Sequence, residues 1–85
     1  MRIYPTLKAV KPLDDYKLML VFGKNEIRIY DFKPNLSHKF YNSLTDIKLF
    51  NSVSVIDDEI VWVTGQDFCP HTLYDHSVPF NKDLI

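Results

Sequence analysis

The 85-residue chain has little cysteine and glycine and no long apolar run. Its single cysteine, Cys69, excludes an internal disulfide framework. Its two glycines, Gly23 and Gly65, stand too far apart for a glycine-rich phosphate loop. No apolar stretch approaches the ~20 residues of a membrane-spanning helix, and Pro5 and Lys8 interrupt the segment where a signal peptide has its apolar core. We therefore expect a soluble, cytoplasmic protein.

The chain also lacks a run of charge of one sign. Ten Lys and Arg residues nearly balance eleven Asp and Glu residues, and the formal net charge is −1. A duplex-binding domain displays a basic stripe, because neutralisation of phosphates supplies most of its affinity. We expect no direct binding of nucleic acid.

Apolar and aromatic side chains are plentiful, at 46% and 14% of the chain. These fractions are typical of a globular domain, and the length allows one domain with a thin core. We predict a single domain over residues 1–85, with an ordered core over about 5–78 and a C-terminal tail, 79–85, that frays.

The N-terminal half reads as three strands. The predicted ranges are Leu7–Leu13, Lys17–Phe22 and Glu26–Asp31, with a turn over Gly23, Lys24 and Asn25 between the last two. Alternation predicts that Leu18, Leu20 and Phe22 share one face of the second strand. In the third strand we place Ile27 and Ile29 inward, and Glu26, Arg28 and Tyr30 outward.

The middle of the chain changes to helical spacing after Pro34. Apolar residues recur every four positions at Leu36, Phe40 and Leu44, with Tyr41 beside them, and Asn35 or Ser37 is available as the cap. This spacing predicts a short amphipathic helix. A second helical turn is predicted over Asp46–Phe50, with Thr45 as its cap and with Ile47 and Phe50 folding back on the sheet.

The C-terminal part predicts a hairpin and a last helix. Strands are expected over Val53–Ile56 and Glu59–Thr64, and both faces of the second are apolar, as in a central strand or one that is covered on both sides. Pro70 fits the first position of a short helix that continues over His71–Asp75. Together these elements predict an α+β fold: an antiparallel sheet of about five short strands with two or three short helices.

The most informative segment is IVWVTGQDFCPHTLY, residues 60–74. Its spacing suits a structural corner built by Gly65, Asp67, Pro70 and Leu73, in which the Asp67 side chain accepts hydrogen bonds from loop amides. Trp62 and Tyr74 would pack across this corner. The alternative is a partner-binding surface, because Trp and Tyr are enriched at binding hot spots.

No residue set predicts catalysis, a metal or a cofactor. Cys69, His71 and His76 do not have an established zinc spacing, and nothing near them would orient a histidine base. The acidic groups Asp14-Asp15 and Asp57-Asp58-Glu59 flank strands, and we interpret them as solvated turns. We predict a protein without enzymatic activity.

These segments, taken together, resemble a known protein family. The segments LMLVFGKNEIRIYDFKP and VWVTGQDFCPHTLY, with Phe40, Leu44 and Phe50 between them, are similar to the bacterial family called domain of unknown function 2442. The resemblance covers about Pro5 to Val78. It implies an α+β domain with no established enzymatic activity and no agreed catalytic residues. It also implies an antitoxin-like or accessory protein that is often encoded beside another small domain.

Two functions follow as hypotheses. The first is a protein-interaction module, the antitoxin-like or accessory component of a small bacterial two-protein system, with a small protein partner encoded nearby or a homodimer. The second is a small-ligand-binding domain with an apolar-aromatic pocket. The candidate interaction or pocket residues are Trp62, Tyr74, Tyr30, Tyr41 and His71. Lys8 and Lys11 would guard the edge of the first strand, so we expect docking through the Val53–Val63 hairpin or the adjoining corner.

Overall fold

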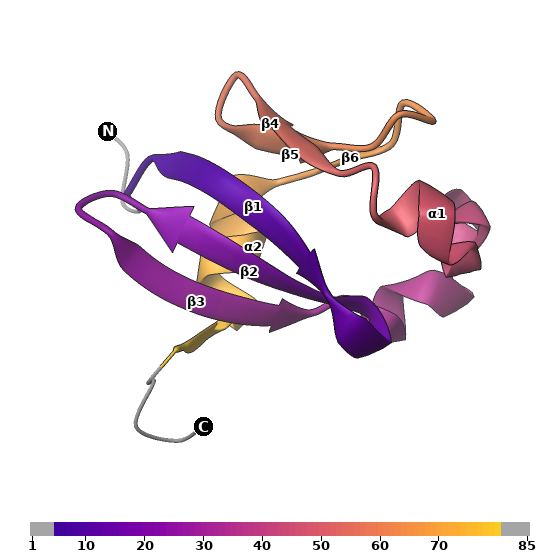
Figure 1. Cartoon of the computed structure of the whole chain (residues 1–85), viewed down its shortest axis with the longest axis horizontal. Helices are drawn as coiled ribbons and strands as arrows, with labels where there is room; N and C mark the ends of the chain where they lie inside the picture. The colour runs from indigo at the N-terminus through magenta and orange to yellow at the C-terminus, as the bar shows by residue number, and fades with distance from the viewer. Residues whose placement is uncertain (1–4, 81–85) are drawn as a thin grey trace.

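The computed structural model describes residues 5–80, and it has an α+β fold of two antiparallel sheets (Figure 1). The elements in chain order are β1 (Leu7–Leu13), the 3-10 turn η1 (Asp14–Tyr16), β2 (Lys17–Phe22), β3 (Glu26–Asp31), the 3-10 helices η2 (Lys33–Ser37) and η3 (Lys39–Thr45), α1 (Ile47–Phe50), β4 (Ser54–Ile56), β5 (Glu59–Val61), β6 (Asp67–Phe68), α2 (Pro70–His76) and β7 (Val78–Pro79). One sheet has the order β1-β2-β3-β7 and the other β4-β5-β6. The predicted fold class is confirmed.

Each of the five predicted strands is present, and β5 is the centre of its sheet, although it ends at Val61 and not at the predicted Thr64. The two-residue strands β6 and β7 were missed, because two residues are too short to show an alternating pattern. Pro79 pairs with Arg28, and the N–H of Phe80 donates to the carbonyl of Ile27 at 2.9 Å. The tail predicted to fray over 79–85 therefore begins with a residue that is paired in the sheet, Pro79, and residues 81–85 lie outside the described residues.

The assignment of faces on β3 was wrong. The register pairs Phe22 with Glu26 and Leu18 with Tyr30, and directly opposed residues lie on one face of a sheet. Tyr30 is therefore buried, at 8% exposure, and Ile27 lies on the opposite face. The tight turn fixes this register, with positive φ at Gly23 (47°) and Asn25 (69°).

The predicted amphipathic helix after Pro34 is two 3-10 helices instead, η2 and η3. His38 separates them in extended geometry, and its side chain, not that of Asn35 or Ser37, accepts a hydrogen bond from the N–H of Phe40. A 3-10 helix has three residues per turn, so Tyr41 and Leu44 share the core-facing side. Phe40 is left 53% exposed, which corrects its predicted place on the apolar face.

The second helical turn is confirmed as α1, with a different cap. Asp46, not Thr45, caps the turn, because its carboxylate accepts from the N–H of Lys48 at 3.0 Å. Phe50 is fully buried as expected, whereas Ile47 is 46% exposed and does not fold back on a sheet.

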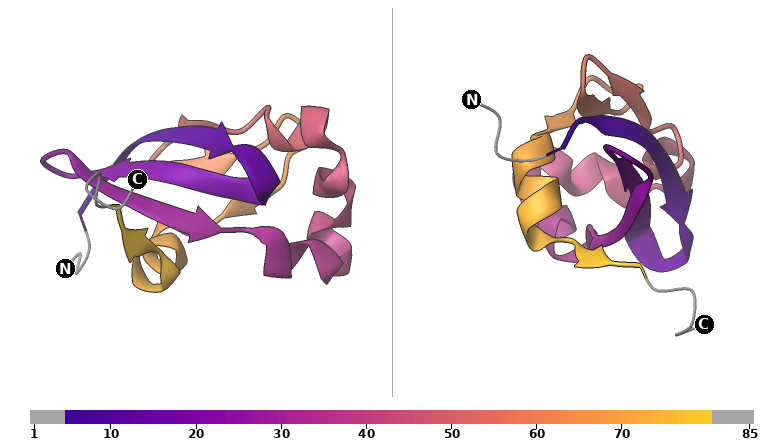
Figure 2. Two further views of the ribbon diagram at one scale, coloured as in Figure 1. Left: turned by 60° about the horizontal axis from the view of Figure 1, so that its bottom comes forward. Right: turned by 90° about the vertical axis from the view of Figure 1, so that its left-hand side faces the viewer.

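The core lies on one side of the four-stranded sheet only. We call the inner face the side of β2 that carries the buried residues Leu18, Leu20 and Phe22; α2 lies behind it (Figure 1). The opposite, outer face carries no helix or strand in any view of the described residues (Figure 2). No helix within residues 5–80 is long and apolar enough to cross a membrane.

Candidate interaction surface

Three of the predicted site residues, Tyr30, Tyr41 and Trp62, meet in an aromatic cluster around Phe32. Phe32 has no exposed surface, and its ring centroid lies 5.0 Å from that of Trp62 and 5.3 Å from that of Tyr41. Phe68 joins the cluster at 5.6 Å from Tyr30. Aromatic contacts of this kind add about 0.5–1.5 kcal/mol each beyond the area that they bury. These rings pack on one another, so they form core and not the wall of an open pocket.

The polar ends of the cluster are hydrogen-bonded to the chain. The hydroxyl of Tyr30 donates to Oδ1 of Asn35 at 2.8 Å, and that of Tyr41 donates to the carbonyl of Asp67 at 2.9 Å. Burial raises the pKa of both phenols above the ordinary value. Both tyrosines therefore stay neutral donors at neutral pH, which suits anchoring and not proton transfer.

Tyr74 belongs to a separate polar corner, made by Glu26, Arg28, Tyr74 and Ser77. The hydroxyl of Tyr74 lies 3.0 Å from both carboxylate oxygens of Glu26, and the guanidinium of Arg28 lies 4.4 Å from the centre of the Tyr74 ring. Nε of Arg28 donates to Oγ of Ser77 at 2.6 Å, and Nη2 donates to its carbonyl at 2.7 Å. The corner ties α2 and β7 to β3. Its donors and acceptors are used internally, so it is a structural joint.

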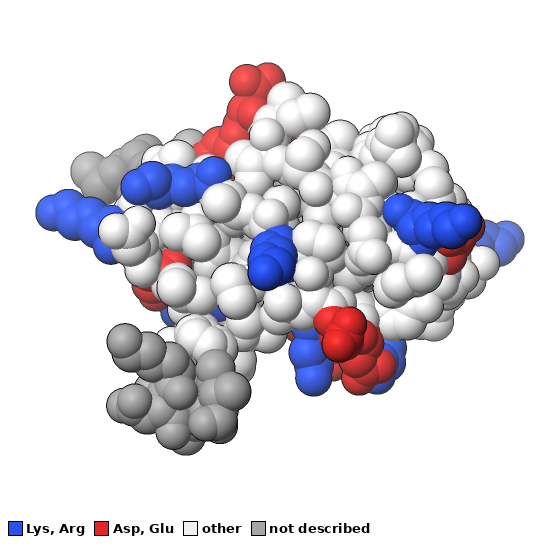
Figure 3. Space-filling view, in the orientation of Figure 1, with Lys and Arg blue, Asp and Glu red and all other residues white. Residues whose placement is uncertain are grey.

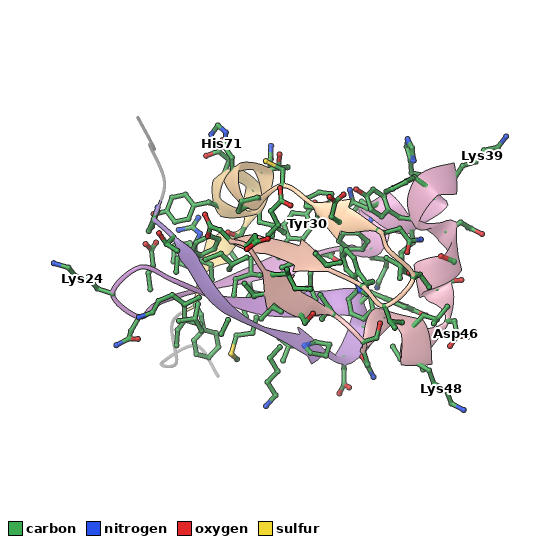
Figure 4. All side chains as sticks on the ribbon, turned by 90° about the horizontal axis from the view of Figure 1, so that it is seen from above. Lys24, Tyr30, Lys39, Asp46, Lys48 and His71 are labelled. Carbon is green, nitrogen blue, oxygen red and sulfur yellow. The ribbon has the colours of Figure 1, made fainter. Side chains whose placement is uncertain are left out.

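His71, the last predicted site residue, lies apart from the other four. It sits at the periphery of the molecule on α2, whereas Tyr30 lies among the central side chains (Figure 4). Its Nε2 is 3.0 Å from Oδ2 of Asp75, one turn further along the helix. Within residues 5–80 no three His, Cys, Asp or Glu side chains are grouped to hold a metal ion. The five predicted residues are thus distributed over three places and do not form one site.

The turn after β5 was predicted to depend on Gly65 and Asp67. The prediction is right for Gly65 and wrong for Asp67. Gly65 has a φ of 94°, and its N–H donates to the carbonyl of Trp62 at 2.9 Å. The Asp67 side chain makes none of the hydrogen bonds found among the described residues. Gln66 holds the loop instead, because its side-chain amide donates to the carbonyl of Phe40 at 3.1 Å and to Oγ of Ser43 at 2.7 Å.

Asp58 was interpreted as a solvated turn residue, and the structure corrects this. It is half-buried, and its Oδ1 accepts a 2.6 Å hydrogen bond from the N–H of Leu7. This bond joins the two sheets and sets β4 beside β1. β4 and β1 are the edges at which the sheets approach each other, so strand addition at β4, which stays a prediction, would have to displace β1.

The outer face of the four-stranded sheet is the surface that sequence reasoning missed. By register its members are Ala9, Lys11 and Leu13 of β1, Lys17, Met19 and Val21 of β2, Ile27, Ile29 and Asp31 of β3, and Val78 of β7. The four apolar side chains from β2 and β3 are half-buried, and Val78 is 60% exposed. Figure 3 shows this side of the molecule, on which uncharged side chains dominate the middle and most charges lie toward the margins.

A correct register would have revealed this face. Because Glu26 pairs with Phe22, the isoleucines of β3 must align with Met19 and Val21 and not with the buried leucines. A contiguous apolar patch on a small domain marks an interaction surface more often than a scatter of single apolar residues does. The arrangement can bind an apolar surface.

Together the two antiparallel sheets and the short helices define a small α+β domain. A family model described as "Protein of unknown function (DUF2442)" matches residues 7–79. The chain therefore belongs to this family. No curated protein and no solved structure matches the chain.

Proposed function

We propose that this protein is a non-enzymatic interaction module of the cytoplasm, the antitoxin-like or accessory half of a small bacterial two-protein system. The observation that carries the proposal is the outer face. It presents Met19, Val21, Ile27, Ile29 and Val78 as one uncovered apolar surface on the described part of the chain. Domains ordinarily bury such a face against a further layer. The partner protein supplies that layer.

The edges of the two sheets are poor docking sites, and this favours the outer face as the docking surface. β1 carries a bulge between Leu7 and Ala9, together with Lys8 and Lys11, and such features discourage the pairing of a further strand. β4 lies beside β1, and β6 and β7 have two residues each. Docking on the face needs none of these edges to open.

Small-ligand binding is the alternative function, and the described residues offer no observation that favours it. Tyr30, Tyr41 and Trp62, the residues proposed to line a pocket, contact one another through Phe32 and Phe68. A ligand would have to separate these rings. The interaction module is therefore the function that we propose.

The experiment is coexpression with the protein encoded by the adjacent gene, followed by affinity purification and light scattering. We expect a stoichiometric complex with the wild-type chain and its loss with Ile29→Lys, which places a charge in the middle of the outer face. Val63→Lys is the matched control, because Val63 is 74% exposed and lies on the turn after β5. Ile56→Lys on β4 tests the hairpin hypothesis in the same assay.

Each outcome has one meaning. No complex with the wild-type chain would overturn the interaction module with that partner. A complex that Ile56→Lys abolishes and Ile29→Lys preserves would move the docking surface to the hairpin. Thermal unfolding of each variant shows whether the fold is intact, so loss of binding is separated from loss of structure.

A further inference from the structure

The outer face carries the positive charge of Lys11 beside its apolar side chains. Lys11 lies opposite Met19 in the register, on the outer face, and it is exposed. None of the ion pairs formed within residues 5–80 involves Lys11. An occupant that covers this face must either leave the ammonium in water or bring a carboxylate to it, because an unpaired buried charge is costly.

The face offers one carboxylate against two lysines, Lys11 and Lys17. The one acidic residue in its rows, Asp31, stands at the end of the sheet opposite Lys17, and its Oδ1 accepts from the N–H of Lys33 at 3.0 Å. Two copies packed face to face would set four lysines, Lys11 and Lys17 of each copy, against two Asp31 carboxylates, so positive charge would remain in excess. This charge pattern disfavours a second copy of the chain as the occupant.

The dimensions of the face also point away from a second copy. β1, β2 and β3, spaced ~4.8 Å apart and each about six residues long at ~3.3 Å per residue, make with the two-residue β7 a surface of at most roughly 15 by 20 Å. That is on the order of 300 Å², a fraction of the ~800 Å² that each partner contributes to a stable interface between two globular proteins, so its size matches one element of a partner and not a whole protein face. A single helix fits, because a helix is ~10 Å in diameter and about 14 residues span ~20 Å.

We infer that the outer face binds one amphipathic helix of a partner protein, with an apolar stripe on Met19, Val21, Ile27 and Ile29 and a carboxylate paired with Lys11. A helix presents such a stripe at positions i, i+3 or i+4, and i+7, and a Glu beside it reaches the β1 edge of the sheet. Bound there, the helix would complete a three-layer arrangement with α2 on the inner face. The inference rests on the proposed function and adds the chemistry of the partner.

The test is a nuclear magnetic resonance titration of the labelled chain with two synthetic helical peptides. Both carry the same leucine stripe; one is flanked by glutamate and the other by lysine. We expect the acidic peptide to shift the amides of Met19, Val21, Ile27 and Ile29 and to bind about tenfold more tightly than the basic one. Lys11→Glu reverses this preference. Lys48→Glu, the same charge change on α1, leaves it unchanged.

Each of the following results would overturn the inference. The first is a shift pattern away from the outer face, or a preference that Lys11→Glu does not alter. The second is the same shifts on raising the concentration of the chain alone, which would make a second copy the occupant. The third is cosedimentation with anionic lipid vesicles that Lys11→Glu abolishes, which would assign the face to a membrane surface. If the adjacent-gene protein binds through Ile29 while neither peptide does, the proposed function stands and the helix is wrong.

Discussion

The indole N–H of Trp62 donates a 3.0 Å hydrogen bond to the main-chain carbonyl of Phe50. This bond joins the end of β5 to the end of α1, and the two rings lie 6.3 Å apart. Trp62 is 1% exposed, so its predicted burial is right. Its partners are Phe50, Phe32 and Tyr41, whereas the ring of Tyr74 packs on Phe22. The predicted contact of Trp62 with Tyr74 across the corner is wrong, because the two rings belong to different clusters.

Trp62→Ala should lower the free energy of unfolding by about 3–5 kcal/mol, because it empties the centre of the aromatic cluster. Trp62→Phe should cost less, about 1–3 kcal/mol, because it keeps most of the packing and leaves only the carbonyl of Phe50 without its donor. Urea unfolding measures both values. An unchanged midpoint for Trp62→Ala would show that the ring does not support the fold.

Gly65→Val should destabilise the protein by about 1–3 kcal/mol through backbone strain alone. Gly65 has a φ of 94°, and a Cβ at this position would meet nothing within 4 Å, so no steric clash contributes. Gly65→Asn is the matched control, because Asn tolerates positive φ better than a β-branched residue does. Thermal unfolding of the two variants should give a clearly lower melting temperature for the valine. Equal values would mean that the turn relaxes to ordinary geometry.

Strand positions could be predicted from the sequence because they depend on local patterns. KLMLVF alternates over Lys17–Phe22, and the neighbouring turn residues Gly23 and Asn25 mark where β2 ends. The strand that follows, EIRIYD, alternates equally well but does not say which of its two sets of side chains faces the core. Arg28 and Tyr30 point inward because Ser77 and Asn35 receive their polar ends, and both partners lie outside the strand.

The candidate surface could not be predicted for the same reason. An inward assignment of Ile27 and Ile29 hides the outer face, and only the pairing of Glu26 with Phe22 reveals it.

The prediction of a helix after Pro34 failed for a different reason. Leu36, Phe40 and Leu44 keep a spacing of four, but His38 interrupts the helix and resets the period to three. Long-range contacts such as Leu7 with Asp58 have no local signal at all.

Asp58→Ala should cost more stability than Asp57→Ala, by about 1–3 kcal/mol, because it leaves the N–H of Leu7 without its acceptor. The two changes form a matched pair. Both residues have positive φ, 51° at Asp57 and 71° at Asp58, so both alanines carry similar backbone strain, and only one removes the bond between the sheets. Asp58→Asn should recover most of the loss, because its Oδ1 still accepts. Chemical denaturation of the three variants gives the difference, and equal losses for the two alanines would show that the bond contributes nothing.

Alkaline pH should weaken the polar corner through Tyr74. The hydrogen bond to Glu26 raises the pKa of the Tyr74 phenol above its ordinary value of 10.0, and burial and the negative charge of Glu26 act in the same direction. A phenol whose pKa is raised by folding contributes stability that is fully present below pH 10 and is lost as the pH rises through the folded-state pKa. Tyr74→Phe should remove this part of the alkaline loss and leave the acid side unchanged. Melting temperatures of the two proteins across the alkaline range provide the measurement, with Tyr16→Phe as the control at a tyrosine whose hydroxyl instead donates to the carbonyl of Thr45. Parallel curves for wild type and Tyr74→Phe above pH 10 would show that Glu26 does not hold the phenol proton in the folded protein.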